Sequence, residues 1–344
     1  MTRDIETSFK PVKKLIPFRN QTGAMSPSFL YTSYGVAWLG EKVHSFMTKE
    51  LIAMPFKPAS YGESRDHLTR ENESWTAQTI VYQTELACTP AEVKVSGGMI
   101  YAVGMGSVSY NLPRAGRQAM WYIGSQSTNV GMQQGPIRNL NHFLAIWAKP
   151  RNAHNGSDEF DLNTLYCKLS YHYQTYEITV HGPDGSILKA DPVGERTNFT
   201  QEDKIINILE FEKDVAWADA SIEANPKYFP GQAPASVSRF EDWGLYIPTG
   251  QISYVIGLSP GKKFDDFRDP TTFRNGLDSM HRLLFNNALE TLLVSDSGGE
   301  EVVGKRVVTS IGIVVVPLIV HILAGFLGLV FVCLGGVFLV YRII

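Results

Sequence analysis

The chain of 344 residues carries 31 Lys and Arg against 34 Asp and Glu, so its formal net charge at pH 7 is −3. This near balance, together with the lack of a long basic run, argues against a nucleic-acid-binding surface. Aromatic residues make up 11 % of the chain, which is typical of a β-rich folded domain and not of a disordered tail.

The first segment, residues 1–30, reads MTRDIETSFKPVKKLIPFRNQTGAMSPSFL. It contains no apolar core of about seven to fifteen residues, so it does not resemble a secretory signal peptide. We expect it to be a flexible N-terminal segment ahead of a β-rich domain over residues 31–296.

Residues 75–190 show the alternation of apolar and polar residues that predicts strands. The pattern is clear in TAQTIVYQTELACTPAEV and in LYCKLSYHYQTYEITVHGPDGSILKA, where Pro183 to Ser186 predict a hairpin turn. We therefore predict a mainly β fold with helical additions (α+β), in which an antiparallel sandwich-like domain precedes one C-terminal transmembrane helix.

Two helices are predicted after the strands, near residues 201–224 and 270–294. Thr200 and Asp203 are placed to cap the first helix, and Asp269 followed by Pro270 is a strong start for the second. The second helix has one apolar face, formed by Phe273, Leu277, Met280, Leu284, Ala288 and Leu292. Because its polar face carries few basic residues, packing on the sheet is favoured over a position in the membrane interface.

Residues 297–306 are expected to be a linker, and residues 307–340 a transmembrane helix, because the latter run contains no Asp, Glu, Lys or Arg. His321 is the polar ionisable side chain of this span, and we expect it to be neutral on a backbone carbonyl. Ala324 and Gly328 form a small-xxx-small pair that would let another membrane helix approach. The expected partners are therefore the lipid bilayer and other membrane helices.

The signals for topology conflict. Lys305 and Arg306 precede the span and only Arg342 follows it, which with the missing signal peptide favours a tail-anchored protein that faces the cytosol. Against this, the two cysteines outside the span, Cys88 and Cys167, both lie in strand-like runs, where a disulfide would form in an oxidising compartment. Two buried thiols in a cytosolic core are the alternative.

N-x-[ST] sequons occur at Asn20, Asn72, Asn155 and Asn198. The last three lie in polar, loop-like stretches, where an acceptor asparagine would be accessible for glycosylation. The sequons therefore agree with an extracytoplasmic domain, although the residues alone leave both topologies open.

No motif for catalysis, a cofactor or a metal is recognisable. The chain has no H-E-x-x-H, P-loop, G-x-S-x-G or C-x-x-C sequence. Asp265, Asp266 and Asp269 lack EF-hand spacing and are better interpreted as a loop with a helix N-cap, and His172 and His181 lack a third ligand. We predict no catalytic residue, no metal and no cofactor. A glycosidase needs only two carboxylates, so an enzyme remains an alternative.

The stretches YTSYGVAWLGEKVHSFMTKELIAMPFKPAS, VYQTELACTPAEV and LYCKLSYHYQTYEITVHGPDGSIL, followed by a helical segment and a terminal span, resemble a family of fungal integral membrane proteins known only as a domain of unknown function. The resemblance implies that Cys88 and Cys167 match two luminal cysteines and that the domain lies outside the cytosol. It implies no activity. The family's apolar helix ahead of MTKELIAMPF and its cytoplasmic continuation after Arg342 have no counterpart, so we expect a truncated product or a shortened relative.

These observations predict a membrane protein of the plasma membrane or secretory pathway with an extracytoplasmic domain. Its expected role is that of a non-enzymatic glycoprotein in cell-envelope organisation or interaction. The alternatives are a membrane-anchored enzyme acting on cell-wall glycans and a cytosol-facing tail-anchored adaptor.

Overall fold

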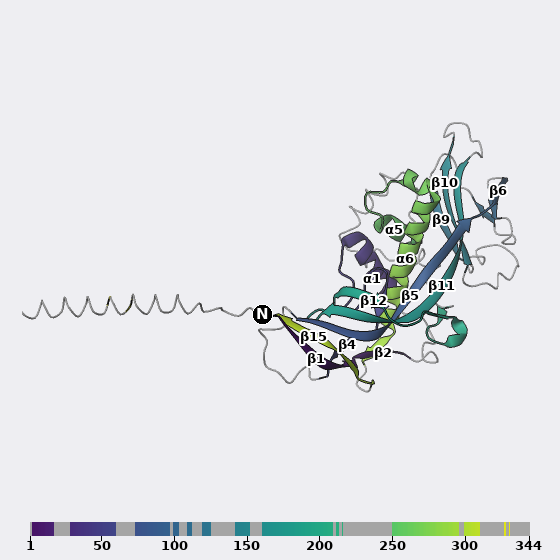
Figure 1. The fold of residues 1–344 in the computed structure, drawn as a ribbon. Helices are drawn as coiled ribbons and strands as arrows, with labels where there is room; N and C mark the ends of the chain where they lie inside the picture. The colour runs from purple at the N-terminus through teal and green to yellow at the C-terminus, as the bar shows by residue number, and fades with distance from the viewer. Residues whose placement is uncertain are drawn as a thin grey trace, which may run out of the picture.

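The structure is a computed structural model, and its mainly antiparallel β-sheet is accompanied by helices, as predicted for an α+β chain (Figure 1). It describes residues 2–16, 28–59, 73–96, 99–102, 109–111, 119–124, 142–151, 160–208, 211–212, 215, 250–295, 299–309, 327 and 330.

A ten-stranded sheet organises the molecule. Its main path has the order β4-β1-β15-β5-β11-β10-β9, while β12 and β13 pair with β11, and β3 pairs with β5. The bounds are β1 Thr2–Pro11, β3 Ile52–Ala53, β4 Phe56–Pro58, β5 Glu73–Pro90, β9 Ala119–Gly124, β10 His142–Pro150, β11 Phe160–His181, β12 Ile187–Pro192, β13 Thr197–Phe199 and β15 Val302–Thr309. Two small sheets add β2 Lys13–Leu15 with β14 Leu293–Ser295, and β6 Val93–Ser96 with β7 Met99–Ala102 and β8 Ser109–Asn111.

The long strands β5 and β11 form the central ribbon of the sheet and run side by side across the molecule (Figure 1). Their antiparallel register continues from Leu165 opposite Pro90 to His181 opposite Ser74. At the end of β11 a turn through Gly185, whose φ is +67°, leads into β12. This is the predicted hairpin, since glycine adopts a positive φ without a steric cost.

Two hydrophobic cores lie on opposite faces of this ribbon, because successive side chains of a strand point to opposite faces. The odd-numbered residues Trp75, Ala77 and Val81 belong to a smaller core. The even-numbered residues Leu86 and Cys88 contact a larger one. The buried face of β5 therefore changes along its length, and each end of the ribbon is covered by different elements.

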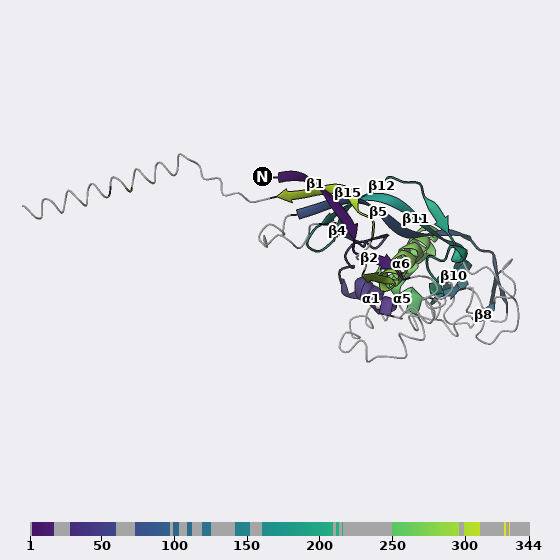
Figure 2. The same cartoon turned by 90° about the horizontal axis from the view of Figure 1, so that it is seen from below.

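Helices cover one face of the sheet (Figure 2). The helical segments are α1 Ser28–Tyr34, the π-helical turn η2 Gly35–Leu39, the 3-10 turn η5 Gln201–Asp203, α5 Gly250–Gly257, the 3-10 turn η7 Phe264–Arg268 and α6 Pro270–Thr291. In the described part of the chain these helices form the layer against the sheet, in place of the second sheet that a sandwich requires. The predicted sandwich arrangement is therefore corrected to a large sheet covered by helices.

Helix α6 agrees with the helix predicted near 270–294. The side chain of Asp269 accepts a hydrogen bond from the backbone N–H of Thr272 at 2.8 Å, and Pro270 occupies the first turn. The predicted apolar face is buried at each of its positions, namely Phe273, Leu277, Met280, Leu284, Ala288 and Leu292. The cap and the apolar period together determine where this helix starts and which face it buries.

The ends of the domain differ from the prediction. The segment expected to be flexible contains β1, and the expected linker 297–306 runs into β15, which pairs with β1 from Thr2 opposite Thr309 to Phe9 opposite Val302. Asp4 and Lys305 form a cross-strand ion pair at 2.7 Å. Each strand needs a partner about 300 residues away in the chain, and a pattern read within one short segment does not reveal such a partner.

At the start of the helix predicted near 201–224, Thr200 and Asp203 form the expected capping box, but they cap only the 3-10 turn η5, which ends at Lys204 with a φ of +56°. The helix therefore does not start at this cap. Residues 216–224 lie outside the described residues. Residues 307–309 of the predicted span belong to β15, and His321, Ala324 and Gly328 lie outside the described residues. Among the residues that the structure does describe, no helix is both long enough and apolar enough to cross a membrane.

Candidate functional site

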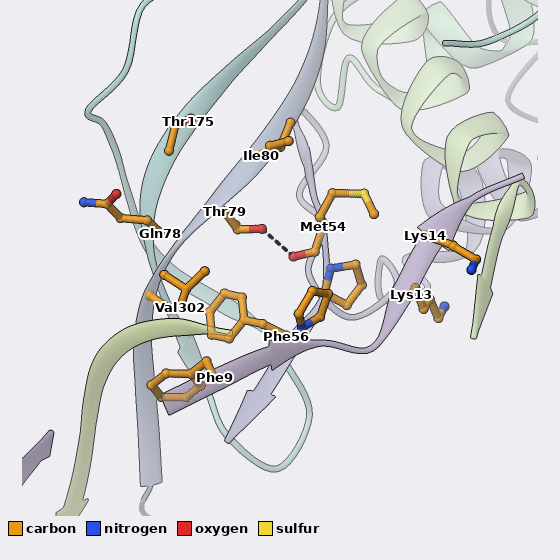
Figure 3. Close-up of a pocket in the computed structure, with 13 residues that line it drawn as sticks. Phe9, Lys13, Lys14, Met54, Phe56, Gln78, Thr79, Ile80, Thr175 and Val302 are labelled. Carbon is orange, nitrogen blue, oxygen red and sulfur yellow. Dashed lines mark hydrogen bonds between the residues drawn. The ribbon is translucent and has the colours of Figure 1, made fainter. Parts of the chain in front are cut away.

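A pocket of about 440 Å³ opens at a break in the sheet, beside strand β5. Strand β15 pairs with β5 as far as Thr76, and β3 pairs with it from Val81, so residues 77–80 of β5 have neither strand beside them. We call this cavity the edge pocket. It is lined by Phe9, Pro11, Lys13, Lys14, Met54, Pro55, Phe56, Ala77, Gln78, Thr79, Ile80, Thr175 and Val302 (Figure 3).

The floor of the edge pocket is the smaller hydrophobic core. Phe9 and Phe56 are almost fully buried and meet edge to face, with their ring centroids 5.4 Å apart. Val302, at the start of β15, is 37 % exposed at the rim. Buried aromatic rings have fixed positions, so the apolar wall exists before a ligand arrives.

The segment that carries Met54 is held against β5 by two hydrogen bonds. Thr79 donates its hydroxyl hydrogen to the Met54 carbonyl at 2.8 Å (Figure 3). The Met54 N–H donates to the Ile80 carbonyl at 2.9 Å. Because backbone groups alternate in direction along an antiparallel strand, the N–H and C=O of Gln78 face the same side as the Ile80 carbonyl. Gln78 is an exposed residue of the pocket lining.

Two lysines mark the other end of the edge pocket. Lys13 and Lys14 belong to β2, which pairs with β14 directly after helix α6. The Lys13 ammonium lies 2.6 Å from the Glu290 carboxylate of α6, which positions the lysine and offsets its charge. The described lining contains no Asp or Glu, so its charged groups are both cationic.

Sequence reasoning did not find this site. Its lining comes from the regions of β1, β2, β4, β5, β11 and β15, and each region contributes only a few side chains. Phe9 and the two lysines fell in the segment expected to be flexible. The apolar residues near Met54 were the available signal, but an apolar run alone does not separate a pocket wall from a core.

Cys88 and Cys167 lie directly opposite each other on β5 and β11, with their Cα atoms 4.0 Å apart and their sulfurs at 2.11 Å. The cysteine pair is thus at disulfide distance, as predicted. Cys167 is completely buried and Cys88 packs against the larger core, close to residues of α6. The bridge therefore joins the two central strands where the helices cover them.

Of the predicted glycosylation sites, Asn198 is described and is exposed. It lies in the short strand β13, opposite His172, and not in the loop that the sequence suggested. Asn72 and Asn155 lie outside the described residues, as does Asn20.

The residues considered for a metal do not come together. His172 contacts Gln83, with the ring Nε2 3.2 Å from the amide oxygen, whereas His181 contacts Asp184 of the hairpin turn at 2.9 Å. Asp265 pairs with Lys149, and Asp269 caps α6. Within the described ranges, no group of three or more His, Cys, Asp or Glu residues is arranged to hold a metal ion.

Glu212 is a half-buried acid whose carboxyl group is shielded from solvent, and the sequence did not single it out. It accepts a hydrogen bond from the hydroxyl of Tyr171 at 2.9 Å, beside the rings of Phe211 and Phe285. Burial raises the pKa of Glu212 to about 8, so the carboxyl group is protonated at neutral pH.

Comparison with models of known protein families, with characterised proteins and with solved structures finds no match to the chain. The resemblance to the fungal membrane family therefore stays a prediction, and the function has to be argued from the edge pocket and the sequence.

Proposed function

We propose that this chain is a membrane-anchored, non-enzymatic binding protein whose domain lies outside the cytosol and takes an apolar ligand in the edge pocket. The observation that carries the proposal is the pocket itself, with its wall of buried aromatic and aliphatic side chains at a break in the sheet. A preformed apolar cavity with a few polar groups is the common form of a small-molecule binding site.

The lining of the edge pocket favours binding over catalysis. Hydrolysis of a glycan requires two carboxyl groups on either side of the bond that is cleaved. The described lining has no carboxyl group, and Glu212 is held by Tyr171 in a different part of the molecule. We therefore keep binding as the function, in the setting of cell-envelope organisation or interaction.

The extracytoplasmic location is supported by two features. Cys88 and Cys167 are at disulfide distance, and such bridges persist in oxidising compartments. Asn198 is exposed on the surface, so an oligosaccharide has room there. The membrane anchor is supported by the uncharged run 307–340, whose first three residues belong to the end of β15.

The location is tested by expressing the full chain in a fungal host and measuring its mobility with and without endoglycosidase and reductant. We expect a glycosidase shift that decreases in Asn72→Gln, Asn155→Gln and Asn198→Gln, and a reductant-sensitive band that is lost in Cys88→Ser. No glycosidase shift, with two alkylatable thiols in the untreated protein, would show that the domain faces the cytosol.

The binding site is tested in phosphatidylcholine vesicles that contain the full chain. Dodecanol and dodecanoic acid, each bearing a terminal diazirine, are photolysed, and the labelled peptides are identified by mass spectrometry. We expect adducts on residues 9–15 or 54–58. Val302→Trp, at the rim, should abolish them, whereas the matched variant Val303→Trp should not, because residue 303 is 64 % exposed and does not line the pocket. Labelling by both probes that is insensitive to Val302→Trp would refute the site.

A further inference from the structure

The strand pairing along one edge of β5 is interrupted beside the edge pocket. Within the described ranges, β15 pairs with this edge as far as Thr76, and β3 pairs with it from Val81. The gap between them covers residues 77–80 of β5. Five residue steps from Thr76 to Val81 correspond to about 16 Å, so about three extended residues would bridge the gap.

The backbone N–H and C=O of Gln78 are directed into this gap. In an antiparallel pair both groups of one residue point to the same side, and the side alternates along the strand. The Ile80 carbonyl accepts from the Met54 N–H, away from β11. The Leu86 N–H likewise points away from β11, because it donates to the Asp278 carboxylate of α6 at 3.1 Å. Gln78 has the same parity as these two residues of β5, so it presents one donor and one acceptor to the edge pocket.

The side chains of β5 determine which residues a docked segment would need. Ala77 belongs to the smaller core, whereas Gln78 points to the opposite, exposed face. Directly opposite residues of paired strands point to the same face. A residue paired with Gln78 would therefore point to the exposed face, and its neighbours would point towards the floor over the small side chain of Ala77. A segment of alternating apolar and polar residues fits this arrangement.

Other classes of ligand satisfy the gap less well. A hydrocarbon chain that filled the cavity would cover the N–H and C=O of Gln78 without supplying a partner, which costs free energy. A small polar molecule would gain none of the apolar burial that the pocket wall offers. An extended peptide supplies both kinds of contact, and it continues the edge along which β15 and β3 already pair with β5.

We propose that the ligand of the edge pocket is a short extended peptide segment of alternating apolar and polar residues, which adds to β5 between β15 and β3 and pairs its backbone with Gln78. This is strand addition at a sheet edge, in which backbone hydrogen bonds provide affinity and the pocket selects side chains. The inference rests on the proposed function, because it names the ligand class of the same pocket.

The test uses the full chain in phosphatidylcholine vesicles, with the diazirine-bearing dodecanol as photolabel and unlabelled peptides as competitors. The parent peptide is acetyl-Ser-Leu-Thr-Leu-Ser-amide, whose two leucines would face the floor. Methylation of the central threonine nitrogen removes the N–H that would donate to the Gln78 carbonyl. Methylation of the second leucine nitrogen is the control, because this N–H would point away from β5. We expect the first methylation to raise the half-displacing concentration at least about fivefold, as the loss of one backbone hydrogen bond provides, and the control to leave it nearly unchanged.

Gln78→Pro makes the matching change in the protein. Proline has no N–H, and the N–H of residue 78 faces the pocket, so the pairing of β5 with β11 loses no hydrogen bond. Gln78→Val is the matched control, since it keeps the N–H at the same exposed position. We expect Gln78→Pro, but not Gln78→Val, to weaken displacement by the parent peptide at least about fivefold, with displacement by dodecanol unchanged. If Gln78→Pro does not fold, the two methylated peptides decide the proposal on the unaltered protein.

The outcomes separate the two proposals. Labelling that Val302→Trp abolishes, but that the parent and both methylated peptides displace equally or not at all, would leave the proposed function standing and overturn the peptide ligand. Equal displacement by the parent peptide from folded Gln78→Pro and Gln78→Val would also overturn the peptide ligand. Labelling that Val302→Trp does not change would overturn both proposals.

Discussion

The bridge between Cys88 and Cys167 should contribute strongly to the free energy of unfolding, and this contribution is the sharpest quantitative expectation from the structure. The two cysteines are 79 positions apart in sequence, so the bond closes a long loop in the unfolded chain. On the chain-entropy model a loop of this length corresponds to about 4.5 kcal/mol. The native strands β5 and β11 stay paired on both sides of the bridge, so most of the effect should come from the unfolded state.

The assay is urea unfolding of the full chain in one fixed membrane mimetic, followed by tryptophan fluorescence with and without reductant. We expect the reduced protein to unfold at a clearly lower urea concentration. Cys88→Ala/Cys167→Ala should behave like the reduced protein, with a further loss of about 1 kcal/mol because Cys167 is completely buried. This variant should not respond to reductant. Equal free energies of unfolding for the oxidised and reduced forms would refute the reasoning.

Three further changes test individual contacts by the same unfolding measurement. Burial raises the pKa of Glu212 to about 8 from an ordinary 4.5, so the folded state holds a proton that the unfolded state has lost, and stability falls as pH rises through this window. Glu212→Gln should therefore match the parent near pH 4 and exceed it by roughly 3 to 5 kcal/mol near pH 8; a gap that does not vary with pH would contradict the burial argument. Arg306→Met leaves the buried carboxylate of Glu73 unpaired and should cost about 3 kcal/mol or more, and Glu73→Gln/Arg306→Met should recover part of this cost. Asp269→Ala removes the cap of α6 and should cost about 1 kcal/mol, and an unchanged midpoint would show that the cap is redundant.

The edge pocket shows how a cavity arises without a sequence motif. Strand β15 stops pairing with β5 at Thr76, and the next strand along that edge, β3, begins opposite Val81. Residues 77–80 pair with neither of these strands, and the edge pocket lies beside them on a floor formed by the smaller core. The position of such a cavity depends on the residues at which the neighbouring strands end. These ends in turn depend on pairing with segments that are distant in the chain.

Local signals in the sequence were sufficient for several elements. The cap at Asp269 and the apolar period that follows it located α6 and its buried face. The alternation around Cys88 and Cys167 located the two central strands, and the turn at Gly185 located the hairpin between β11 and β12. In each of these elements the determining interactions join residues that are close in the chain or repeat with a fixed period.

Tertiary structure decided the remaining features. Residues 2–11, expected to be flexible, and residues 302–306, expected to belong to a linker, lie in the neighbouring strands β1 and β15, because these two strands pair with each other. The buried face of β5 changes along its length. The structure therefore has one large sheet, with helices on part of one face and the smaller core on the other, where a sandwich was predicted. The edge pocket required all of these pairings together. A short stretch of sequence shows the apolar period and the caps of its own residues. The partner of a strand is determined by hydrogen bonds and side-chain packing with segments that lie hundreds of residues away in the chain.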